Sequence, residues 1–386
     1  MSRKKRVGID VTSALTQGGG IGRYTRELID ALSKTQFDSA LDVTLFSAKP
    51  PLQTPVQNPL PTHPSINYKP APIDERWLYR IWYRLRFPLP VQTFTGRLDL
   101  FHSPDFVLPP IAGNIPSLLT VHDLSFLHYP HTFTPALVNY LNRVVPWSVK
   151  RATHILADSV ATQNDLVELW GTPAEKITVL YSGVHQRFQE IKDHQELDQV
   201  RTKYGLGSNP YILAVGTVQP RKNYQMLIQA FAKIADRLPH SLIITGGKGW
   251  LFDEILAEVE AQNLIGRVVF TGFVDDEDLS AIYSAAEVLA FPSLYEGFGL
   301  PILEAMACGT PVINSDASCL PEVAGEATIQ LTPHSIDEWS GKLAQLLEDK
   351  VLQDQLKMKG KAQAEKFSWG KSAEQLLSIY ERLLIG

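Results

Sequence analysis

The stretch FPSLYEGFGLPILEAMACGTP, residues 291–311, carries the pattern that decides the fold. An apolar run ends at Phe291, a glycine-rich turn follows, and Pro301 stands at the start of a second apolar segment. Proline is favoured in the first turn of a helix, so the pattern predicts a strand, a turn and a helix in that order. The N-terminus of such a helix, together with the exposed amides of the turn, is an anion site.

Short β-branched runs alternate with longer amphipathic segments along the whole chain. This alternation is typical of parallel sheets covered by helices, and it predicts an α/β protein with two doubly wound domains in tandem. The predicted strands are residues 6–11, 42–46, 117–121, 154–157, 177–180, 211–215, 241–245, 267–271, 288–291 and 311–314. The first domain is expected to span residues 1–205 and the second 206–370, because a run of turn-forming residues separates them. A C-terminal helix at about 371–386 is expected to pack back onto the first domain.

The composition is that of a globular protein. Of 386 residues, 44% are hydrophobic and 20% are charged, which excludes disordered and fibrous classes. Cys308 and Cys319 are too few for a disulfide scaffold or a four-thiolate zinc site, so a reducing compartment is expected. The basic first residues are not followed by the apolar core of a signal peptide, and no apolar run reaches the length of a membrane span. We therefore expect a cytoplasmic protein.

Charge is divided unevenly along the chain. Residues 1–190 contain 19 Lys and Arg against 15 Asp and Glu, whereas the remainder contains 17 against 26. In the basic half, a helical reading of residues 76–86 puts Leu78, Ile81, Trp82 and Leu85 on one stripe, Arg76, Arg80 and Arg84 opposite, and Tyr79 and Tyr83 at the border. This segment either contacts an anionic membrane or acceptor, or is an ordinary surface helix that packs Trp82 into the core. Just before it, eight prolines between residues 50 and 72 predict an extended loop.

A glycine run, Gly18 to Gly20, follows the first predicted strand and opens a helix. The amides of Gly19 and Gly20 are unshielded by side chains and are candidates to bind a phosphate, with a merely flexible turn as the alternative. The dinucleotide fingerprint G-x-G-x-x-G is incomplete here, and the Gly-Gly-Lys at 246–248 does not complete a Walker motif. Neither a nicotinamide site nor a P-loop is therefore predicted.

Charged side chains gather at the predicted strand ends, where open α/β sheets bind ligands. Arg221 and Lys222 are candidates to neutralise a diphosphate, since arginine gives paired hydrogen bonds and lysine a point charge. A solvated helix cap is the alternative. Glu296 and Glu304 flank the predicted anion site, and carboxylates there suit the vicinal hydroxyls of a sugar and a ribose on either side of the phosphates. His122 ends another strand and is either a catalytic group or a buried, hydrogen-bonded histidine.

Together these motifs resemble those of the retaining family 4 glycosyltransferases, whose GT-B fold consists of two facing Rossmann-like domains with an interdomain cleft. The resemblance spans nearly the whole chain. Glu296 and Glu304 match the family's E-x7-E motif, Lys222 its phosphate-binding lysine, Gly19 and Gly20 its amino-terminal glycine loop, and His122 its strand-end histidine. The residues at 20–24 and 122–126 are most similar to the mannosyltransferase-B-like branch used in bacterial polysaccharide assembly.

The resemblance implies a role for each matching residue. It implies that Glu296 binds the hydroxyls of the donor sugar and that Glu304 binds the ribose. The amides of Phe298, Gly299 and Leu300 are expected to bind the sugar and the β-phosphate, and Val274 is expected to lie against the nucleobase. Catalysis is assigned to His122 and Glu296. Two departures from the family pattern concern the phosphates and the domain connection. Thr217 stands where many members have an arginine, so we expect Arg221 to replace that cation. The residues YSGV at 181–184 stand where PNGV is common, which puts the interdomain contact of that asparagine in doubt.

The activity that the resemblance implies is the transfer of a hexosyl unit, with retention, from a nucleotide sugar to a glycan or lipid-linked acceptor in polysaccharide biosynthesis. UDP-glucose or another UDP-hexose is the expected donor, and GDP-mannose is the alternative. No cofactor or metal is expected, since cations and helix N-termini can stabilise the departing nucleoside diphosphate. The acidic residues at 276–278 match a D-x-D metal pattern but are interpreted as the first turn of a helix.

The expected partners are thus the donor and the saccharide acceptor, with no nucleic acid. Peripheral contact with an anionic membrane at its inner face stays open as the alternative to an ordinary surface helix at residues 76–86. Two other classes of function stay open. A non-catalytic nucleotide-sugar or glycan-binding protein would have the same fold, and so would a sugar phosphorylase or a nucleotide-sugar epimerase.

Overall fold

The computed structural model describes residues 3–35, 41–50 and 60–385, and its contacts divide the chain into two units. Unit 1 comprises Met1–Leu124, Asn139–Gly183 and Ser368–Gly386, and unit 2 comprises Ser125–Val138 and Val184–Phe367. The division at Gly183 lies before the boundary expected at residue 205, because residues 184–205 pack with the second unit. The backbone N–H of Ile191 donates to Ser284 Oγ at 2.9 Å, and Lys203 Nζ lies 2.6 Å from Asp278 Oδ2.

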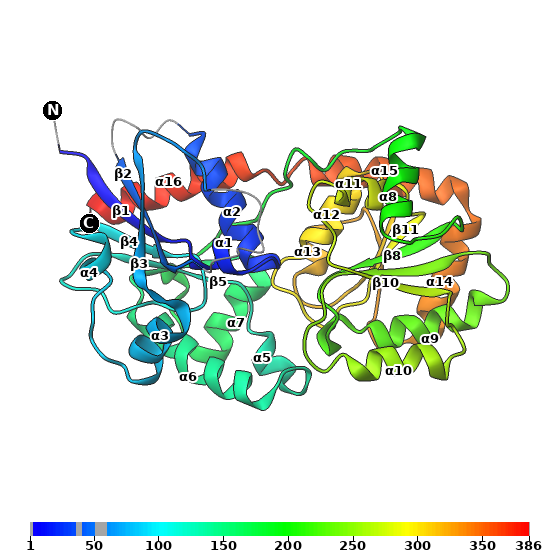
Figure 1. Cartoon of the computed structure of the whole chain (residues 1–386), viewed down its shortest axis with the longest axis horizontal. Coiled ribbons are helices and arrows are strands. Elements are labelled where there is room, and N and C mark those ends of the chain that lie inside the picture. Colours follow the sequence, from blue (N-terminus) through cyan, green and yellow to red (C-terminus); the bar gives the residue numbers. More distant parts are fainter. Residues whose placement is uncertain (1–2, 36–40, 51–59, 386) are drawn as a thin grey trace. The chain divides into compact units, whose positions relative to one another are not determined.

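In the described residues, unit 1 contains a parallel sheet of seven strands in the order β3-β2-β1-β4-β5-β6-β7. The strands are β1 (Lys5–Asp10), β2 (Leu41–Lys49), β3 (Ile66–Asp74), β4 (Leu100–Ser103), β5 (Ser117–Val121), β6 (His154–Ala157) and β7 (Ile177–Val179). The helices are α1 (Thr12–Thr16), α2 (Gly20–Ser33), α3 (Glu75–Tyr79), η1 (Arg80–Arg84), α4 (Gln92–Thr95), α6 (Pro135–Arg151), α7 (Val160–Trp170), η3 (Ala174–Lys176) and α16 (Trp369–Ile385). Helices α2 and α16 lie together on one face of the sheet, and α6 and α7 on the other (Figure 1).

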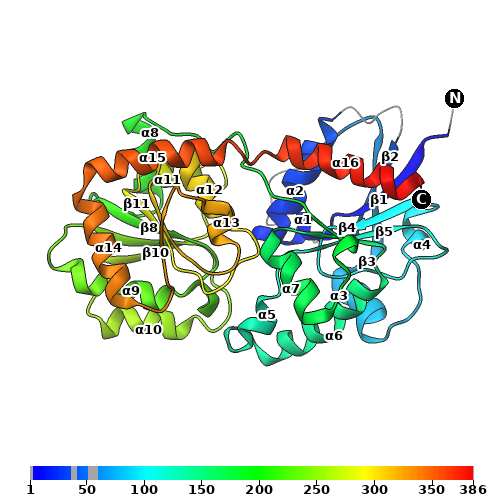
Figure 2. The ribbon, with the colours of Figure 1, turned by 180° about the vertical axis from the view of Figure 1, so that it is seen from behind.

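Unit 2, which is described throughout, contains a parallel sheet of six strands in the order β10-β9-β8-β11-β12-β13. The strands are β8 (Tyr211–Val215), β9 (Ser241–Thr245), β10 (Val268–Gly272), β11 (Val288–Phe291), β12 (Val312–Ser315) and β13 (Ile329–Leu331). The helices are α5 (Ser125–His128), η2 (Pro130–Thr132), α8 (His194–Lys203), η4 (Pro220–Lys222), α9 (Tyr224–Ala235), α10 (Asp253–Ala261), α11 (Leu279–Ser284), α12 (Leu300–Ala307), α13 (Leu320–Ala324), α14 (Ile336–Glu348) and α15 (Lys350–Ala364). Helices α9, α10 and α14 cover one face and α11, α12 and α15 the other (Figure 2).

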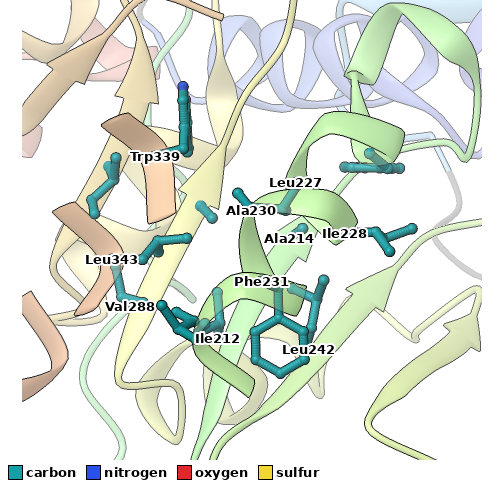
Figure 3. Close-up of a cluster of buried hydrophobic side chains, with 14 of the residues drawn as sticks. Ile212, Ala214, Leu227, Ile228, Ala230, Phe231, Leu242, Val288, Trp339 and Leu343 are labelled. Carbon is teal, nitrogen blue, oxygen red and sulfur yellow. The ribbon is translucent and has the colours of Figure 1, made fainter. Parts of the chain in front are cut away.

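The core of unit 2 shows why the strand segments are mostly apolar. Strands covered by helices on both faces bury both sets of side chains, so they read as continuous runs of Val, Ile and Leu. Ile212 and Leu242 lie against Phe231 of α9, and Leu343 of α14 closes the same cluster (Figure 3). Each of these four side chains is fully buried.

All ten predicted strands are present, but the pattern does not predict β3, β4 and β13. The interpretation of residues 50–72 as an extended loop is wrong for β3, which contains Pro70 and Pro72. Proline has no backbone N–H to donate to a neighbouring strand. It is tolerated in β3 because β3 lies at the edge of the sheet, so that one of its sides has no neighbouring strand to bond. The earlier prolines at 51, 55 and 59 lie outside the described residues.

The predicted stripe at 76–86 is partly wrong. Trp82 is buried against Phe46 and Phe94, as the surface-helix interpretation requires, but Leu85 is 72% exposed and Tyr83 is buried. The reason is a wide helical turn at η1, in which the N–H of Leu85 bonds to the carbonyl of Arg80, five residues earlier. Such a turn rotates the following residues off the stripe that a regular helix would form.

The C-terminal helix α16 belongs to unit 1. Its Tyr380 hydroxyl lies 2.7 Å from Nδ1 of the buried His102 on β4, and its Ser372 Oγ donates to the carbonyl of Tyr181. At the start of the helix the backbone comes very close to Gly183, where a Cβ would lie 2.0 Å from the backbone nitrogen of Trp369. Glycine is therefore required at residue 183 by this close approach, whatever residues precede it.

Each sheet has one place where the order of its strands reverses: between β1 and β4 in unit 1 and between β8 and β11 in unit 2. Ligands of doubly wound sheets bind at the carboxyl ends of the strands at such a point. Gly19 and Gly20 follow β1, and His122 follows β5. Arg221 and Lys222 follow β8, and Glu296 follows β11. No helix in the described ranges has the length and apolar character needed to span a bilayer.

A substitution at Gly22 tests the packing of α1 against α2. A Cβ at Gly22 would lie 2.0 Å from the carbonyl oxygen of Gln17, so we expect Gly22→Ala to lower the free energy of unfolding of unit 1 by about 1–3 kcal/mol. Gly341→Ala is the control, because a methyl group there meets open space inside α14 and should stabilise unit 2 by about 0.5–1 kcal/mol. Urea titrations followed by circular dichroism measure both, and a Gly22→Ala protein as stable as the wild type would contradict the close approach.

Candidate functional site

Arg221, Lys222 and Glu296 meet at the strand-order reversal of unit 2. Glu296 Oε2 accepts a hydrogen bond from Arg221 Nη1 at 2.8 Å, and Glu296 Oε1 accepts one from Lys222 Nζ at 2.5 Å. Arg221 also donates to the carbonyl of Tyr295. Lys222 and Glu296 are both buried, and the ammonium group lies 5.2 Å from the centroid of the Phe291 ring. We call Arg221, Lys222 and Glu296 the cation cluster of unit 2.

The electrostatics of the cation cluster favour an anion. Burial alone would raise the pKa of Glu296, but the charges of Arg221 and Lys222 outweigh it and lower the pKa to about 2. The carboxylate is therefore ionised at neutral pH, and two cations with one anion leave one net positive charge. A buried site with a net positive charge attracts a phosphate group and keeps its cations in place before the phosphate arrives.

The turn that carries Glu296 is held by the two residues that precede α13. Ser318 Oγ accepts from the N–H of Glu296 and donates to its carbonyl, both at 2.9 Å. The Cys319 thiol lies 3.1 Å from the carbonyl oxygens of both Glu296 and Phe298. Neither side chain stands in a sequence motif, and both act only on backbone atoms, so their role cannot be predicted from the sequence.

Gly299 ends this turn and directs it into α12. Its φ of +104° lies in the left-handed region that favours glycine, and a Cβ there would lie 2.8 Å from a methyl of Leu320. Leu300 and Pro301 then begin α12, whose first N–H groups are an anion site next to the cation cluster in sequence. Phe298 itself is buried against Phe367, so any contact it makes with a ligand uses its backbone.

The loop that carries Lys222 is also fixed by glycines. Gly216 has a φ of +147°, and a Cβ there would lie 3.0 Å from Lys222 Cε, so the lysine side chain passes over this glycine. The Tyr224 hydroxyl donates to the carbonyl of Gly216. Gly246, after β9, has room for no side chain, because a Cβ there would lie 2.1 Å from the oxygen of Gly216. The Gly-Gly-Lys sequence at 246–248 therefore serves to pack two loops together.

Glu304 and Val274 take places outside the cation cluster. Glu304 is buried in α12 and accepts a hydrogen bond from the Tyr283 hydroxyl at 2.8 Å. Val274 follows β10, two strands from β8, and its side chain is buried while that of Phe273 is exposed. The exposed residue at this strand end is therefore Phe273 rather than Val274. The structure brings Arg221, Lys222 and Glu296 into direct contact, and it gives Glu304 a separate partner.

The two aspartates of the acidic segment 276–278 are paired with cations. Asp276 lies 3.6 Å from Arg187, and Asp278 lies 2.6 Å from Lys203. Asp278 precedes α11 directly, so the D-x-D residues stand at the start of a helix.

In unit 1, Gly19 and Gly20 stand at the N-terminus of α2 with open space where their side chains would be. His122 is buried, and both of its ring nitrogens have partners. Nδ1 lies 2.7 Å from Asp158 Oδ2, and Nε2 lies 3.3 Å from the carbonyl oxygen of Pro104. In its protonated form the ring donates both hydrogen bonds. His122 is thus buried and hydrogen-bonded, and its catalytic role stays a prediction.

The charge state of His122 is set by Asp158. Burial alone would lower the pKa of His122, but Asp158, with smaller contributions from Asp105 and the Pro104 carbonyl, raises it to about 9. The imidazole is therefore an imidazolium at neutral pH. Because this pKa lies above the ordinary 6.5, the charge on His122 contributes its full stabilisation below pH 6.5 as long as Asp158 is ionised, and this contribution is lost as the pH rises through 9.

Carboxylates and tyrosines also gather near the β1 and β4 ends of unit 1. Burial raises the pKa of Asp10 to about 6, with further contributions from Asp105 and Glu75. Burial and both aspartates raise the pKa of Tyr83 well above its usual value. The centroids of the Tyr140 and Tyr79 rings lie 4.6 Å apart, and the ring planes are 39° from parallel. The charge of Asp105 contributes to raising the pKa of the Tyr140 hydroxyl. We call Asp10, Glu75, Asp105, Tyr83 and Tyr140 the acid–tyrosine group.

Family models match both halves of the chain. One described as Glycosyltransferase Family 4 matches residues 18–187, and one described as Glycosyl transferases group 1 matches residues 198–363. The chain is 30% identical over 374 residues to the O-antigen chain mannosyltransferase B of Escherichia coli, which covers 94% of this chain and 96% of the relative. The chain belongs to the family 4 glycosyltransferases.

Solved structures share the fold of this glycosyltransferase. Sucrose-phosphate synthase of Thermosynechococcus elongatus has a TM-score of 0.76 at 21% identity, covering 99% of this chain and 100% of that one. Anabaena HepE, solved in complex with UDP and glucose, has a TM-score of 0.72 at 19% identity, covering 98% and 100%. At these identities the likeness shows the fold alone, and it confirms the predicted GT-B fold of two Rossmann-like domains.

A titration of His122 in the glycosyltransferase tests its pairing with Asp158. We expect the imidazole resonances of His122 in an NMR titration to change with a midpoint near pH 9. Asp158→Asn removes the partner charge, so the midpoint should fall toward the ordinary 6.5. A wild-type midpoint at or below 6.5 would show that burial outweighs the carboxylate.

Proposed function

We propose that this glycosyltransferase transfers a mannosyl unit from GDP-mannose, with retention, to a saccharide acceptor in polysaccharide assembly. The identity of the relative supports the sugar, since the Escherichia coli protein that is similar along almost its whole length is an O-antigen chain mannosyltransferase. A similar protein of Salmonella typhimurium, 30% identical over 268 residues, is also an O-antigen chain mannosyltransferase. A UDP-hexose, the donor expected from the sequence, is the second candidate.

The cation cluster carries the proposal, because its charge and position suit the diphosphate of a nucleotide sugar. In the proposed complex the β-phosphate lies at the N-terminus of α12, within reach of Arg221 and Lys222. Glu296 keeps both cations oriented, and its oxygens retain lone pairs that accept hydrogen bonds from sugar hydroxyls. Glu304 binds the ribose, and the backbone at Val274 contacts the base.

The proposed reaction breaks the bond between the anomeric carbon and the β-phosphate oxygen, and the electron pair stays on that oxygen. The cations and the α12 amides stabilise this developing charge without reorganising. The acceptor oxygen forms the new glycosidic bond on the same face of the sugar. Its proton passes to the departing phosphate oxygen, which accounts for retention without a covalent intermediate on the protein. In this proposal Arg221 and Lys222 do the work for which other transferases use a metal ion.

The acid–tyrosine group of unit 1 supports a neutral acceptor. Carboxylates accept hydrogen bonds from hydroxyl groups and repel anions, and tyrosine rings offer a flat apolar face with a polar edge. A hydroxyl-rich saccharide fits these groups better than an acceptor that carries phosphate at the reacting sugar. The acceptor is therefore proposed to be a glycan, free or linked to a lipid at its far end.

The exposed part of residues 75–87 supports contact with an anionic membrane. Trp77, Leu85 and Phe87 are exposed by 54%, 72% and 58%. Arginines 76, 80, 84 and 86 are exposed around them, and the Arg80 guanidinium lies 4.8 Å from the centroid of the Trp77 ring. Apolar side chains inside a basic surface suit the interface of an anionic bilayer.

Glu296→Gln tests the proposed chemistry. Hexosyl transfer from GDP-mannose should fall by about 100-fold or more, because the variant cannot hold both cations and the sugar hydroxyls. Affinity for GDP should change much less than transfer does, because the loss of one negative charge beside the phosphates offsets the weaker positioning of the two cations. Full transfer activity in this variant would contradict the proposal.

A thermal-shift panel of GDP, UDP and ADP, each with its nucleotide sugars, identifies the donor. A ligand at 100 times its Kd should stabilise the protein by about 2.7 kcal/mol, and GDP-mannose is expected to give the largest shift. A larger shift with a UDP-hexose, followed by its transfer, would favour the second candidate. Binding without turnover of any donor would favour a non-catalytic binding protein, and an epimer or a sugar 1-phosphate formed from donor alone would favour the other enzyme classes.

Flotation with vesicles tests the membrane contact. We expect the protein to float with vesicles rich in phosphatidylglycerol and not with phosphatidylcholine alone, and added salt should weaken the binding. Trp77→Ala combined with Leu85→Ala should reduce it several-fold. Ile265→Ala, which removes a side chain 76% exposed in unit 2, is the matched control. Equal recovery with both vesicle types would contradict an electrostatic contact.

A further inference from the structure

Residues 125–138 follow the His122 strand end in the sequence, yet they pack with unit 2. The indole Nε1 of Trp250 donates to the carbonyl of Thr132 at 2.7 Å, and the Phe133 and Trp250 rings lie 5.6 Å apart. Thr132 and Phe133 are both buried. This segment is therefore part of the packed surface of unit 2, although the sequence on both sides of it belongs to unit 1.

The same segment covers the residue before Glu296. The His128 ring stacks on the Tyr295 ring, with centroids 4.9 Å apart and planes 18° from parallel. The Tyr129 ring also lies near the Tyr295 ring, with centroids 6.3 Å apart. Tyr295 is only 7% exposed, whereas His128 is on the surface. The histidine ring thus forms part of the cover over the Tyr295 side chain.

Tyr295 is joined directly to the cation cluster. Its carbonyl accepts a hydrogen bond from Arg221, and Glu296 is the next residue. The Arg221 guanidinium therefore bridges the Tyr295 backbone and the Glu296 carboxylate. A movement of the Tyr295 ring and backbone would displace both of these acceptor groups together.

Trp250 links the segment to the other side of the cation cluster. It follows Gly249, whose N–H donates to the carbonyl of Val218, and the N–H of Val218 donates to Gly247. Val218 lies in the loop between β8 and Lys222. Residues 125–138 thus contact the turn that carries Glu296 and also, through Trp250, the loop that carries Lys222.

We propose that His128 is a positioning residue of the donor site: its ring, stacked on Tyr295, holds Arg221 and Glu296 in the geometry that binds the donor diphosphate. This inference rests on the proposed function and adds a residue to it from a segment outside the nucleotide-binding sequence motifs. The action is through the aromatic face, so any flat ring at residue 128 should support it. The loss of the ring should loosen the Arg221 contacts without unfolding the unit.

The test uses the full chain with His128→Ala, His128→Phe and, as matched control, His131→Ala. His131 is an exposed histidine of the same segment, and its ring meets Tyr129 rather than Tyr295. We expect His128→Ala to weaken the binding of GDP, measured by calorimetry, and to lower kcat/KM for the donor, each by about three- to tenfold. His128→Phe should restore both to within about twofold of the wild type, and His131→Ala should change neither.

Two results would overturn the inference: a His128→Ala protein that binds and reacts like His131→Ala, or a His128→Phe protein as defective as His128→Ala. The second would make the imidazole itself a ligand of the donor. Calorimetry with GDP and with UDP needs no turnover, so the comparison of variants stands even if the wild type transfers no sugar and the proposed function fails. If the wild type binds neither nucleotide, both the inference and the proposed function are wrong.

Discussion

The bond network of Glu296 with Arg221 and Lys222 is the constraint on which the rest of unit 2 depends. Burying three charged groups is costly unless each finds a partner, and removing one partner leaves an uncompensated charge. The Glu296 carboxylate pairs with both cations. Ser318 and Cys319 hold the loop that carries Glu296. The glycines at 216, 246 and 299 follow from the same need, since the backbone must approach closely to bring these loops together.

Each unit holds at its strand ends a group whose sign opposes the net charge of that half of the sequence, and in unit 1 the imidazolium of His122 stands at a strand end as well. The acidic half of the chain holds the net positive cation cluster, and the basic half holds the acid–tyrosine group. Local charge at a buried edge matters more than net charge, because screening by water is weak there and strong at the surface. A diphosphate and a hydroxyl-rich saccharide are the ligands that such a division suits.

The motif residues were accessible to sequence reasoning because they are local. The turn at 291–301 contains its own strand end, glycines and helix start, so its anion site follows from a single stretch. Edge strands such as β3 escape the same reasoning, since Pro70 and Pro72 read as loop unless the unpaired side of the strand is known. Leu85 was misplaced because one wide helical turn changes the phase of the apolar stripe.

Periodicity and neighbours a few residues apart are enough to predict the α/β class, the alternation of strands and helices, and the charged residues that stand at the strand ends. Which of those residues meet depends on how the chain folds in three dimensions. Arg221 and Glu296 are 75 residues apart, His122 and Asp158 are 36 apart, and His128 reaches Tyr295 from a segment flanked by the other unit. Such contacts depend on strand order and loop packing, which couple distant parts of the chain and leave no periodic signal in it.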